Sequence, residues 1–510
     1  MTRQQDVIVV GYGPVGMVTA ALLGRAGHTV SVVERYTGLY NLPRAASFDD
    51  ETMRTLAALG VDEALLPDLR AQPDYQWRNA SGELLLEQHF AAVGRSGWAE
   101  WYMMYQPYLE KALDDLCRSL PNVRVLHASP VTALKYDDHA VAVEVAGTQG
   151  PEQLTADYLV ACDGGNSFVR QALDIDLDDY GFSEPWMVCD FRLRRPVAIP
   201  PALQIGDPAG PTSVISIGRT HHRFSFMLDS EEDFQTQQDP ARVWRRVAAY
   251  LEPDDADLIR VATYTFRSLI AREWRRGRIL LAGDAAHQMP PFLGQGMCSG
   301  IRDAQNLAFK LDLVLRAKAG PDILATYQRE REPHVRSVTE KGVELGRRQT
   351  IRDPELAAER DRALLAAREQ TAAAPQALRF PGLADGLFAL ASGPGRGGLS
   401  IQGVVDDGTC RALLDQVVGA GFHLLLMPQA AAALDRTTAE RLQEAGVRVI
   451  SFGREVDDIE GATRGGSPNW DARRSPCAPT STSSAPPRQP PRSGFSPKNW
   501  PPSPDSRMRQ

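Results

Sequence analysis

Residues 7–16, Val7-Ile8-Val9-Val10-Gly11-Tyr12-Gly13-Pro14-Val15-Gly16, decide the fold of this chain. The four apolar residues predict a buried strand, and the Gly-x-Gly-x-x-Gly turn after them opens a helical segment from Pro14 to about Ala26. A second strand follows at Thr29 to Val33. Parallel neighbouring strands need such a helical crossover, so the start of the chain predicts an α/β fold.

The glycine turn has the chemistry of a dinucleotide site. Gly11 allows the tight turn, Gly13 lets backbone N–H groups approach a pyrophosphate, and Gly16 lets the helix pack on the strand. Pro14 and Val15 open the helix, whose positive end would face the anion, and an acid at the end of the second strand, Glu34, is placed to bind ribose hydroxyls. The alternative is a tight turn without a ligand, and the pattern alone does not separate NAD from FAD.

Composition excludes several classes of function. The 510 residues are 43% hydrophobic and 24% charged with a net charge of -8, which gives no basic face for nucleic acid. No run of about 18 apolar residues predicts a membrane helix, and no export signal precedes the first strand, so we expect a cytoplasmic protein. The six cysteines form no Cys-x-x-Cys pair or Cys/His cluster, so we expect neither disulfides nor a metal.

The pattern along the rest of the chain predicts an interrupted first domain. Strand-like segments between about 180 and 270 predict a mainly antiparallel sheet, and Arg278 to Ala282 then returns to the character of the first strands. We therefore expect a nucleotide domain at 1–179 and 269–345, an inserted sheet at 180–268, a helical linker at 346–378, an α/β domain at 379–460 and a disordered Pro/Ser/Arg-rich tail at 461–510.

Two later segments carry a family resemblance. Asp163-Gly164 ends an apolar strand and is followed by Ser167-Phe168-Val169-Arg170, and residues 283–300 begin Gly283-Asp284-Ala285-Ala286-His287 and end in a Pro/Gly-rich turn. Taken separately, the first is also typical of an Asp helix cap and the second of an ordered loop. In this order along the chain they resemble the single-component flavin aromatic hydroxylases, which implies a Rossmann-type FAD-binding domain and an inserted substrate-binding sheet.

The resemblance implies roles for particular residues. Asp284 would bind the ribityl chain, Pro290 and Pro291 would line the isoalloxazine, and Gly294 to Met297, with Gly296 between them, would approach its pyrimidine edge. A helix beginning near Met297 would direct its positive end at the reduced flavin. The other residues that we expect near FAD are Arg35, Arg44, Gln106, Val131, Asp163 and Gly283.

Further motifs point to one branch of the family. Pro43-Arg44-Ala45, Asp49-Asp50-Glu51, the Gly294 to Cys298 turn and Arg302-Asp303-Ala304 are similar to the 3-(3-hydroxyphenyl)propionate hydroxylases. The resemblance covers residues 5–345 well and 380–455 loosely. It implies a phenylpropanoid acid or polyketide-type phenol as substrate and a thioredoxin-like C-terminal domain. That domain is expected to be incomplete, because the chain after Ile459 turns into the tail, which we interpret as a truncated or frame-altered end.

The resemblance also implies a mechanism. NADH or NADPH, visiting transiently because no second dinucleotide motif is present, would reduce bound FAD, and O2 would form a C4a-hydroperoxide that hydroxylates the phenol. The sequence identifies no catalytic base: His287 and His222 are candidates, and Pro290 and Pro291 are candidates as a wall beside the flavin. A non-catalytic FAD-binding subunit of a biosynthetic complex is the alternative function. We expect a monomer or homodimer.

Overall fold

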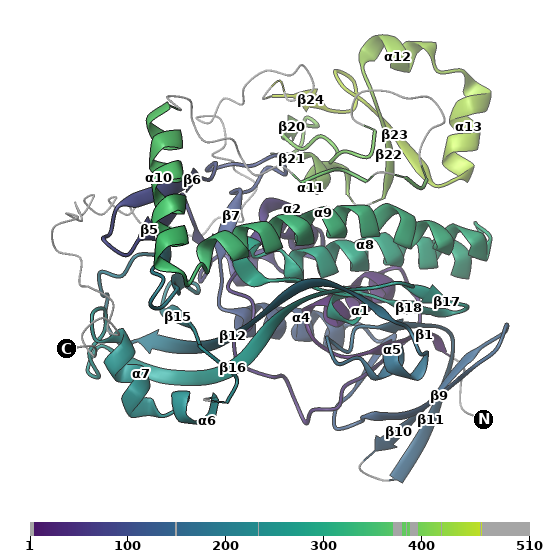
Figure 1. Cartoon of the computed structure of the whole chain (residues 1–510). Helices are drawn as coiled ribbons and strands as arrows, with labels where there is room; N and C mark the ends of the chain where they lie inside the picture. The colour runs from purple at the N-terminus through teal and green to yellow at the C-terminus, as the bar shows by residue number, and fades with distance from the viewer. Residues whose placement is uncertain are drawn as a thin grey trace, which may run out of the picture.

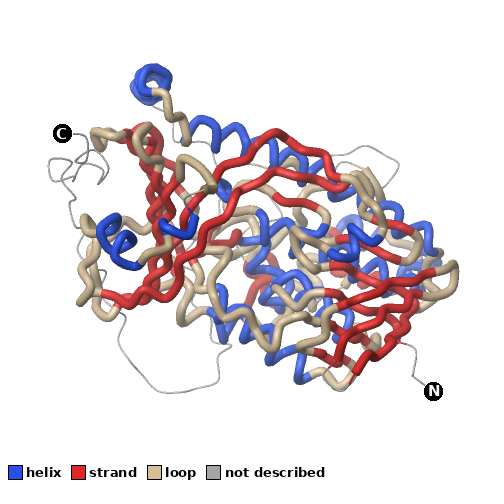
Figure 2. Tube along the Cα trace, turned by 60° about the horizontal axis from the view of Figure 1, so that its bottom comes forward, coloured by secondary structure: helices blue, strands red, loops and turns tan. Residues whose placement is uncertain are grey.

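The computed structural model of the chain describes residues 5–147, 150–232, 234–370, 380–383, 385–387, 396–419, 421–459 and 461. Two large sheets form most of the molecule, and α8 and α9 run side by side between the C-terminal elements and the long strands β12 and β16 (Figure 1). In Figure 2 the strands gather in two groups, which two long neighbouring strands connect. The predicted tail, apart from residue 461, lies outside the described residues.

The first sheet contains the predicted strand-turn-helix-strand unit. Its central order is β17-β18-β11-β1-β2-β8, with β10 and β9 added beside β11. β1 pairs in parallel with both β2 and β11, as the crossover helix requires. The strands are β1 (Gln5–Val10), β2 (Val30–Val33), β8 (Val123–Leu126), β9 (Val131–Tyr136), β10 (Val141–Gly147), β11 (Gly150–Ala161), β17 (Arg275–Arg276) and β18 (Ile279–Leu281).

Helices cover this sheet and complete an α/β unit of the Rossmann type. α1 packs against both α4 and α8, and its buried small residues, Gly16, Ala20 and Ala21 among them, allow that close approach. β18 returns to the sheet beside β11, so segments far apart in sequence form one domain core. The helices are α1 (Pro14–Arg25), α4 (Gln106–Ser119), α5 (Phe168–Ala172), α8 (Gly296–Leu315) and α9 (Thr326–Gln349).

The second sheet is antiparallel apart from the pair β5 and β13. Its order is β19-β16-β12-β15-β14-β13-β5-β6. The strands are β5 (Asp74–Asn79), β6 (Leu84–His89), β12 (Leu177–Leu193), β13 (Ala202–Gly206), β14 (Thr212–Ser216), β15 (His221–Met227), β16 (Ala256–Ala271) and β19 (His287–Gln288). It therefore takes strands from both sides of the range 180–268, and the expected boundaries at 179 and 268 fall inside β12 and β16.

Alternation along these strands separates two faces. Met187, Cys189 and Phe191 of β12 pack with Val243 and Val247 of α7 in a second apolar core. The intervening residues of β12 face the other way. The helices beside this sheet are α6 (Phe234–Gln237), α7 (Pro240–Val247) and, next to β6, α10 (Pro354–Gln370).

Shorter elements connect the two sheets. β3 (Ser47–Asp49), β4 (Arg70–Ala71) and β7 (Trp101–Met103) form a small sheet, and α2 (Asp50–Ala58) and α3 (Asp62–Leu65) follow β3. Three 3-10 turns lie near the end of the nucleotide unit: η1 (Gly283–Ala285), η2 (Pro291–Leu293) and η3 (Pro321–Ala325). The first two connect β18 to α8 and so lie where the family motif is found.

The C-terminal part has its own small core around Val405, Leu414, Ile450 and Phe452. Its elements are β20 (Val404–Asp406), β21 (Arg411–Leu413), α11 (Leu414–Val418), β22 (Phe422–Leu426), α12 (Pro428–Ala433), α13 (Arg436–Glu444), β23 (Val447–Ser451) and β24 (Asp457–Asp458). β22 and β23 pair in parallel and are connected in sequence by α12 and α13. β20, β21 and β24 form a separate sheet. Within the described residues, no helix combines the length and apolar character needed to cross a membrane.

Candidate functional site

One continuous cavity of about 2140 Å³ lies between the first sheet, the second sheet and the start of α8. It exceeds the roughly 300–1,000 Å³ of a typical small-ligand pocket, so it has room for a large cofactor and a second molecule. It brings together most of the residues singled out from the sequence: Gly11, Gly13, Pro14, Val15, Glu34, Arg35, Arg44, Gln106, Val131, Asp163, Asp284, Pro291, Gly294, Gly296 and Met297. Gly16, Gly283, Pro290, His222 and His287 do not line it.

The glycine turn between β1 and α1 forms one end of the cavity. Gly11 has a φ of 98°, and a Cβ there would lie 2.4 Å from the carbonyl oxygen of Cys162. A Cβ at Gly16 would lie 2.1 Å from the oxygen of Gly11, so both positions are closed to side chains by the protein itself. Gly13 differs, because a Cβ there would meet nothing within 4 Å. The open space beside Gly13 is the space that an anion at the start of α1 would fill.

The acid at the end of β2 is held by backbone donors. Glu34 accepts hydrogen bonds from the backbone N–H of Tyr12 at 2.7 Å and of Tyr36 at 3.0 Å. Arg35 lies beside it at the surface of the cavity, where its guanidinium donates to the Tyr36 hydroxyl. Val131 lies at the start of β9 on the same part of the cavity wall. The carboxylate is thus fixed in position beside the glycine turn.

Gln106 has a more specific place than the sequence indicated. Its side-chain oxygen accepts from the backbone N–H of Arg44 at 3.0 Å and of Ala45 at 2.6 Å, while its amide nitrogen donates to Glu110 at 2.6 Å. The Arg44 guanidinium lies 4.4 Å from the centre of the Tyr40 ring. Gln106 therefore fixes the backbone that presents Arg44 to the cavity.

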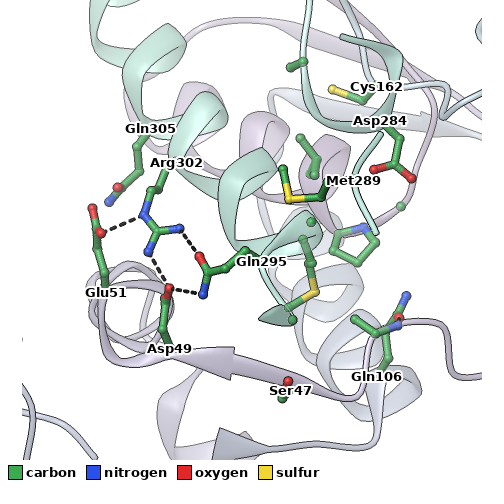
Figure 3. A pocket seen from close by; sticks show the side chains of 18 of the residues that line it. Ser47, Asp49, Glu51, Gln106, Cys162, Asp284, Met289, Gln295, Arg302 and Gln305 are labelled. Atoms are coloured by element: carbon green, nitrogen blue, oxygen red, sulfur yellow. Dashed lines mark hydrogen bonds and ion pairs between the residues drawn. The ribbon is translucent and has the colours of Figure 1, made fainter. Parts of the chain in front are cut away.

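Two aspartates from the family motifs lie on the cavity wall. Asp163 accepts from the backbone N–H of Val169 at 3.1 Å through Oδ2, whereas its buried Oδ1 has no hydrogen-bond partner among the described groups. Asp284 also lines the cavity (Figure 3). Burial raises the pKa of the Asp163 carboxyl, whereas Asp284 is exposed to the cavity. The unpartnered Asp163 oxygen and the exposed Asp284 carboxyl can both accept hydrogen bonds from a hydroxylated ligand.

The turn before α8 forms the middle of the cavity wall. Pro291 begins η2, and Gly294 ends it with a φ of 61°; a Cβ there would lie 2.8 Å from the Trp101 ring. α8 then begins at Gly296, so its positive end lies beside the cavity. Pro290 is buried outside the lining and lies against Gly342 of α9. Of the two prolines expected beside a flavin, only Pro291 is therefore on the cavity surface.

A charged network that the sequence analysis did not identify supports this turn (Figure 3). Arg302 of α8 donates to Glu51 at 2.7 Å and to the side-chain oxygen of Gln295 at 3.1 Å, and it pairs with Asp49. Gln295 also donates to Asp49 at 3.0 Å. Burial acts to raise the pKa of Asp49, but Arg302 and the hydrogen bonds from Thr52 lower it overall. The network ties α2 to the residue before α8.

The structure corrects both histidine candidates. His287 is fully buried, and its Nε2 lies 2.6 Å from Asp303, which also accepts from Arg331 at 2.9 Å. His222 is buried on β15, and burial lowers its pKa to about 3. Neither side chain lines the cavity. A base must reach the proton that it removes, so this geometry argues against both. The sequence around a single histidine does not show whether its side chain faces the cavity or the core.

The second sheet contributes cavity residues that sequence reasoning missed. They are Tyr75, Leu86, Gln88, Trp186, Val188, Ala202, Gln204, Ser213, Ile215, Arg223, Ser225, Tyr264 and Phe266. The signal available was the alternation in Arg223-Phe224-Ser225-Phe226, where Phe224 and Phe226 face the second core. Burial raises the pKa of Tyr264, so its hydroxyl keeps its proton at neutral pH and acts as a donor.

Together these residues fit FAD. The open space at Gly13, the fixed Glu34 carboxylate, the unpartnered Asp163 oxygen and the start of α8 lie along one cavity. These are the groups that a pyrophosphate, a ribose, a hydroxylated chain and an electron-accepting ring would contact.

Comparison with known proteins gives the same result. Residues 4–342 match a family described as "FAD binding domain". A probable NADH-specific resorcinol 4-hydroxylase of Rhodococcus jostii is 50% identical over 453 residues, covering 88% of this chain and 84% of that protein. A 3-(3-hydroxy-phenyl)propionate/3-hydroxycinnamic acid hydroxylase of Mycolicibacterium smegmatis is 35% identical over 435 residues, covering 82% of this chain and 76% of that protein.

Solved structures extend the similarity to the fold. Aklavinone-11 hydroxylase, in a ternary complex with FAD and aklavinone, has a TM-score of 0.73 and 27% identity, covering 91% of this chain and 92% of that one. The p-nitrophenol 4-monooxygenase of Pseudomonas putida has a TM-score of 0.64 and 26% identity, covering 72% of this chain and 95% of that one. The family expected from the motifs is confirmed.

Proposed function

The chain belongs to the FAD-dependent aromatic hydroxylases, and we propose that it uses NADH and O2 to hydroxylate a phenol held between the second sheet and the flavin. The observation that carries this proposal is the single cavity that runs from the open Gly13 turn to the side chains of β13 to β16. NADH is preferred because the relative at 50% identity is described as NADH-specific.

FAD, when bound, supplies the redox chemistry that activates oxygen. In the proposed arrangement Gly13 and the start of α1 bind the pyrophosphate, Glu34 binds the ribose, and Asp163 and Asp284 bind hydroxyls of the connecting chain. Arg35, Arg44, Gln106 and Val131 belong to the same wall. The start of α8 stabilises negative charge beside it.

The chain's own residues position the substrate and exclude water. Trp186 contacts both Phe266 and Phe292, with ring centres 5.7 Å apart for Trp186 and Phe266 and 6.0 Å apart for Trp186 and Phe292. They form an apolar wall beside Pro291. A dry wall of this kind protects a water-sensitive step, and the Tyr264 hydroxyl can donate a hydrogen bond to a phenolic oxygen.

The finer domain assignments are part of this proposal. The second sheet would be the substrate-binding domain, and residues 379–460 a partial thioredoxin-like domain. The parallel pair β22 and β23 with α12 and α13 between them supports the second assignment. A monomer or homodimer in the cytoplasm stays a prediction.

The proposed function predicts coupled turnover. The purified yellow protein should oxidise NADH faster when resorcinol or 3-(3-hydroxyphenyl)propionate is present, and the product should contain one atom from isotopically labelled O2. NADH consumption, oxygen uptake and product mass measure this directly. Reduction of the flavin with no hydroxylated product from any phenol would disprove it, and bound flavin that NADH and NADPH both leave oxidised would favour the non-catalytic subunit.

Substituting His222 should leave the pH dependence of turnover unchanged. Because its pKa is lowered to about 3 by burial, the imidazole is neutral throughout the range from pH 6 to pH 9 and lies outside the cavity lining. We expect His222→Phe to keep kcat/KM within about twofold of the wild type, since it changes packing and one hydrogen bond to the Pro200 backbone, both outside the cavity lining. A lost limb in the pH profile of kcat/KM would restore His222 as a base.

A further inference from the structure

The loop that connects β6 to β7, residues 90–100, forms part of the cavity wall. Its two ends lie together, because Phe90 stacks on Trp101, the first residue of β7, with ring centres 5.4 Å apart. Trp101 also lies against the turn before α8, where a Cβ at Gly294 would be 2.8 Å from its ring. The cavity-lining residues of this segment are Phe90, Ala91, Val93, Gly94, Arg95, Glu100 and Trp101. The 90–100 loop therefore starts and ends beside the turn that we expect to meet the flavin.

Helix α2 holds the middle of this loop. The Asp50 carboxylate, at the start of α2, accepts a hydrogen bond from the backbone N–H of Ser96 at 2.7 Å. The backbone N–H of Asp50 donates to the carbonyl oxygen of Glu100 at 3.3 Å. A Cβ at Gly94 would overlap the Asp50 carboxylate, so glycine is what lets the loop approach α2 this closely. The position of the 90–100 loop thus depends on the position of α2.

The C-terminal part of the chain packs on the tip of the same loop. Gly97 has a φ of 80°, and a Cβ there would lie 2.6 Å from the side chain of Leu413 and 3.1 Å from that of Gln402. Leu399 and Ser400 line the cavity themselves. The C-terminal part therefore borders the cavity and also contacts the loop that forms its wall.

Arg54 of α2 binds this C-terminal part through four hydrogen bonds. Its guanidinium forms a bidentate pair with Asp415 of α11, which lies next to α2 in Figure 1, with N–O distances of 2.5 Å and 2.8 Å. It also donates to the carbonyl oxygen of Ser400 at 3.1 Å and to the Ser400 hydroxyl at 3.0 Å. The Arg54 side chain is 14% exposed, so salt screens this pair less than a surface pair. A bidentate pair fixes geometry, so Arg54 sets the position of α2 relative to α11.

Among the described residues, no shared apolar core explains this contact. The C-terminal part packs around its own apolar cluster, which has no described member in common with the core of the nucleotide unit. Neither Arg54 nor Asp415 belongs to either cluster. Charged hydrogen bonds depend on geometry, whereas apolar burial is non-directional. A charged anchor between two separate cores therefore fixes how they are placed relative to one another.

The same helix reaches the turn before α8. Glu51 accepts from Arg302 at 2.7 Å, and Arg302 donates to the side-chain oxygen of Gln295 at 3.1 Å (Figure 3). Arg54 follows Glu51 by three positions on a helix of nine residues. A rigid element carries a shift at one position to the others, so a movement of Arg54 would reach both the 90–100 loop and this turn.

We propose that the Arg54–Asp415 pair positions α2 and the 90–100 loop, so that the C-terminal part keeps water out of the flavin cavity. This rests on the proposed function. Coupled turnover converts NADH, a proton, O2 and the phenol into NAD+, water and the hydroxylated phenol. When water enters the cavity, NADH, a proton and O2 give NAD+ and hydrogen peroxide instead, and the phenol is left unchanged. Arg54 and Asp415 are positioning residues, because neither lines the cavity.

Iodide quenching of flavin fluorescence, without NADH or a phenol, measures solvent access to the flavin in the purified holoenzyme. Arg54→Met should raise the quenching constant about threefold, while FAD affinity stays within about twofold of the wild type. With NADH and resorcinol present, the share of NADH that ends as hydrogen peroxide should rise by a similar factor. The kcat for NADH oxidation should change little, because the pair touches neither NADH nor the phenol.

Two further variants test the pair itself. Asp415→Asn removes the charge from the other side and should reproduce the effect, which keeps the test available if Arg54→Met does not fold. The exchanged pair, Arg54→Asp with Asp415→Arg, should bring iodide quenching back towards the wild-type value. Arg54→Asp alone places two carboxylates together and should be quenched at least as strongly as Arg54→Met.

Arg124→Met is the matched control. Arg124 of β8 forms a bidentate pair with Glu152 of β11 at 3.1 Å and 3.4 Å, and neither residue lines the cavity. The variant removes the same side chain from the same kind of pair at a distant place. It should therefore leave both the quenching constant and the peroxide share at their wild-type values.

The outcomes separate this inference from the proposed function. A lower melting temperature of Arg54→Met with unchanged quenching and an unchanged peroxide share would overturn the inference, since the pair would then serve stability alone. An exchanged pair that is quenched as strongly as Arg54→Met would overturn it as well. If the wild type forms only peroxide with every phenol, the proposed function fails, whereas the iodide comparison still decides the role of Arg54.

Discussion

Gly13→Asp should abolish tight FAD binding while leaving the apoprotein folded. A side chain at Gly13 has open space within the protein, since an added Cβ meets nothing within 4 Å. Its φ of -85° also suits any residue. The new carboxylate would occupy the proposed place of the pyrophosphate and repel it. We expect at least a hundredfold weaker FAD binding, about 2.7 kcal/mol or more, measured by flavin fluorescence on titrating apoprotein.

Two further variants control for misfolding. Gly13→Ala should give an intermediate loss of affinity, because a methyl group takes up space but adds no charge. Gly11→Ala should instead lower the melting temperature of the apoprotein, because its φ of 98° is unfavourable and its Cβ would lie 2.4 Å from the Cys162 oxygen. If Gly13→Asp keeps wild-type affinity, the pyrophosphate does not lie at this turn.

Arg302→Met should be the most destabilising single change in the site. It removes the ion-pair partner of Asp49, which is 7% exposed, and leaves that buried carboxylate with hydrogen bonds from Thr52 and Gln295 but without a counter-charge. Breaking a buried pair in this way costs about 3–5 kcal/mol. The hydrogen bond from Arg302 to Gln295 is lost as well, so the turn before α8 loosens. Urea unfolding followed by tryptophan fluorescence measures the change in stability.

The pH dependence of this loss has a definite sign. In the wild type the pKa of Asp49 is lowered, so its ion pair adds stability above about pH 4 and loses it as the pH falls through the folded-state pKa. In Arg302→Met the same buried carboxyl takes up a proton more readily. The stability gap between the two proteins should therefore be largest near pH 7.5 and shrink towards pH 4.5.

The double variant Asp49→Asn with Arg302→Met is the control for charge. It removes both members of the pair, so it should recover much of the stability lost in the single variant. A double variant as unstable as Arg302→Met alone would show that packing of the long arginine side chain, rather than the unpaired charge, is responsible.

The sequence predicted the nucleotide half of the molecule well for a physical reason. The constraints around Gly11 and Gly16 are local, because a strand, a tight turn and a helix must follow one another within a few residues. Few residue types other than glycine fit at these two positions. The order of the later motifs then showed that Asp163 and Asp284 belong to the same unit. The cavity indeed contains both.

The sheet side of the cavity could not be predicted in the same way. The alignment of Gln204, Ser213 and Ser225 on the cavity wall depends on the register of three strands, and the addition of β5 and β6 to the sheet joins residues far apart in sequence. Register is set by tertiary packing, which a single sequence does not reveal. His222 and Arg223 show the consequence: they are adjacent, but only Arg223 lines the cavity.

The continuous segment from β12 to β16 leaves the nucleotide-binding unit through β12 and returns to it through β16, and these two strands are antiparallel neighbours along most of their length. Because the segment begins and ends in two neighbouring strands, the loops and strands between β12 and β16 can change without moving the positions where the segment joins the nucleotide-binding unit. Such an architecture lets new aromatic specificities evolve on one half of the enzyme while the ancestral nucleotide scaffold is inherited intact.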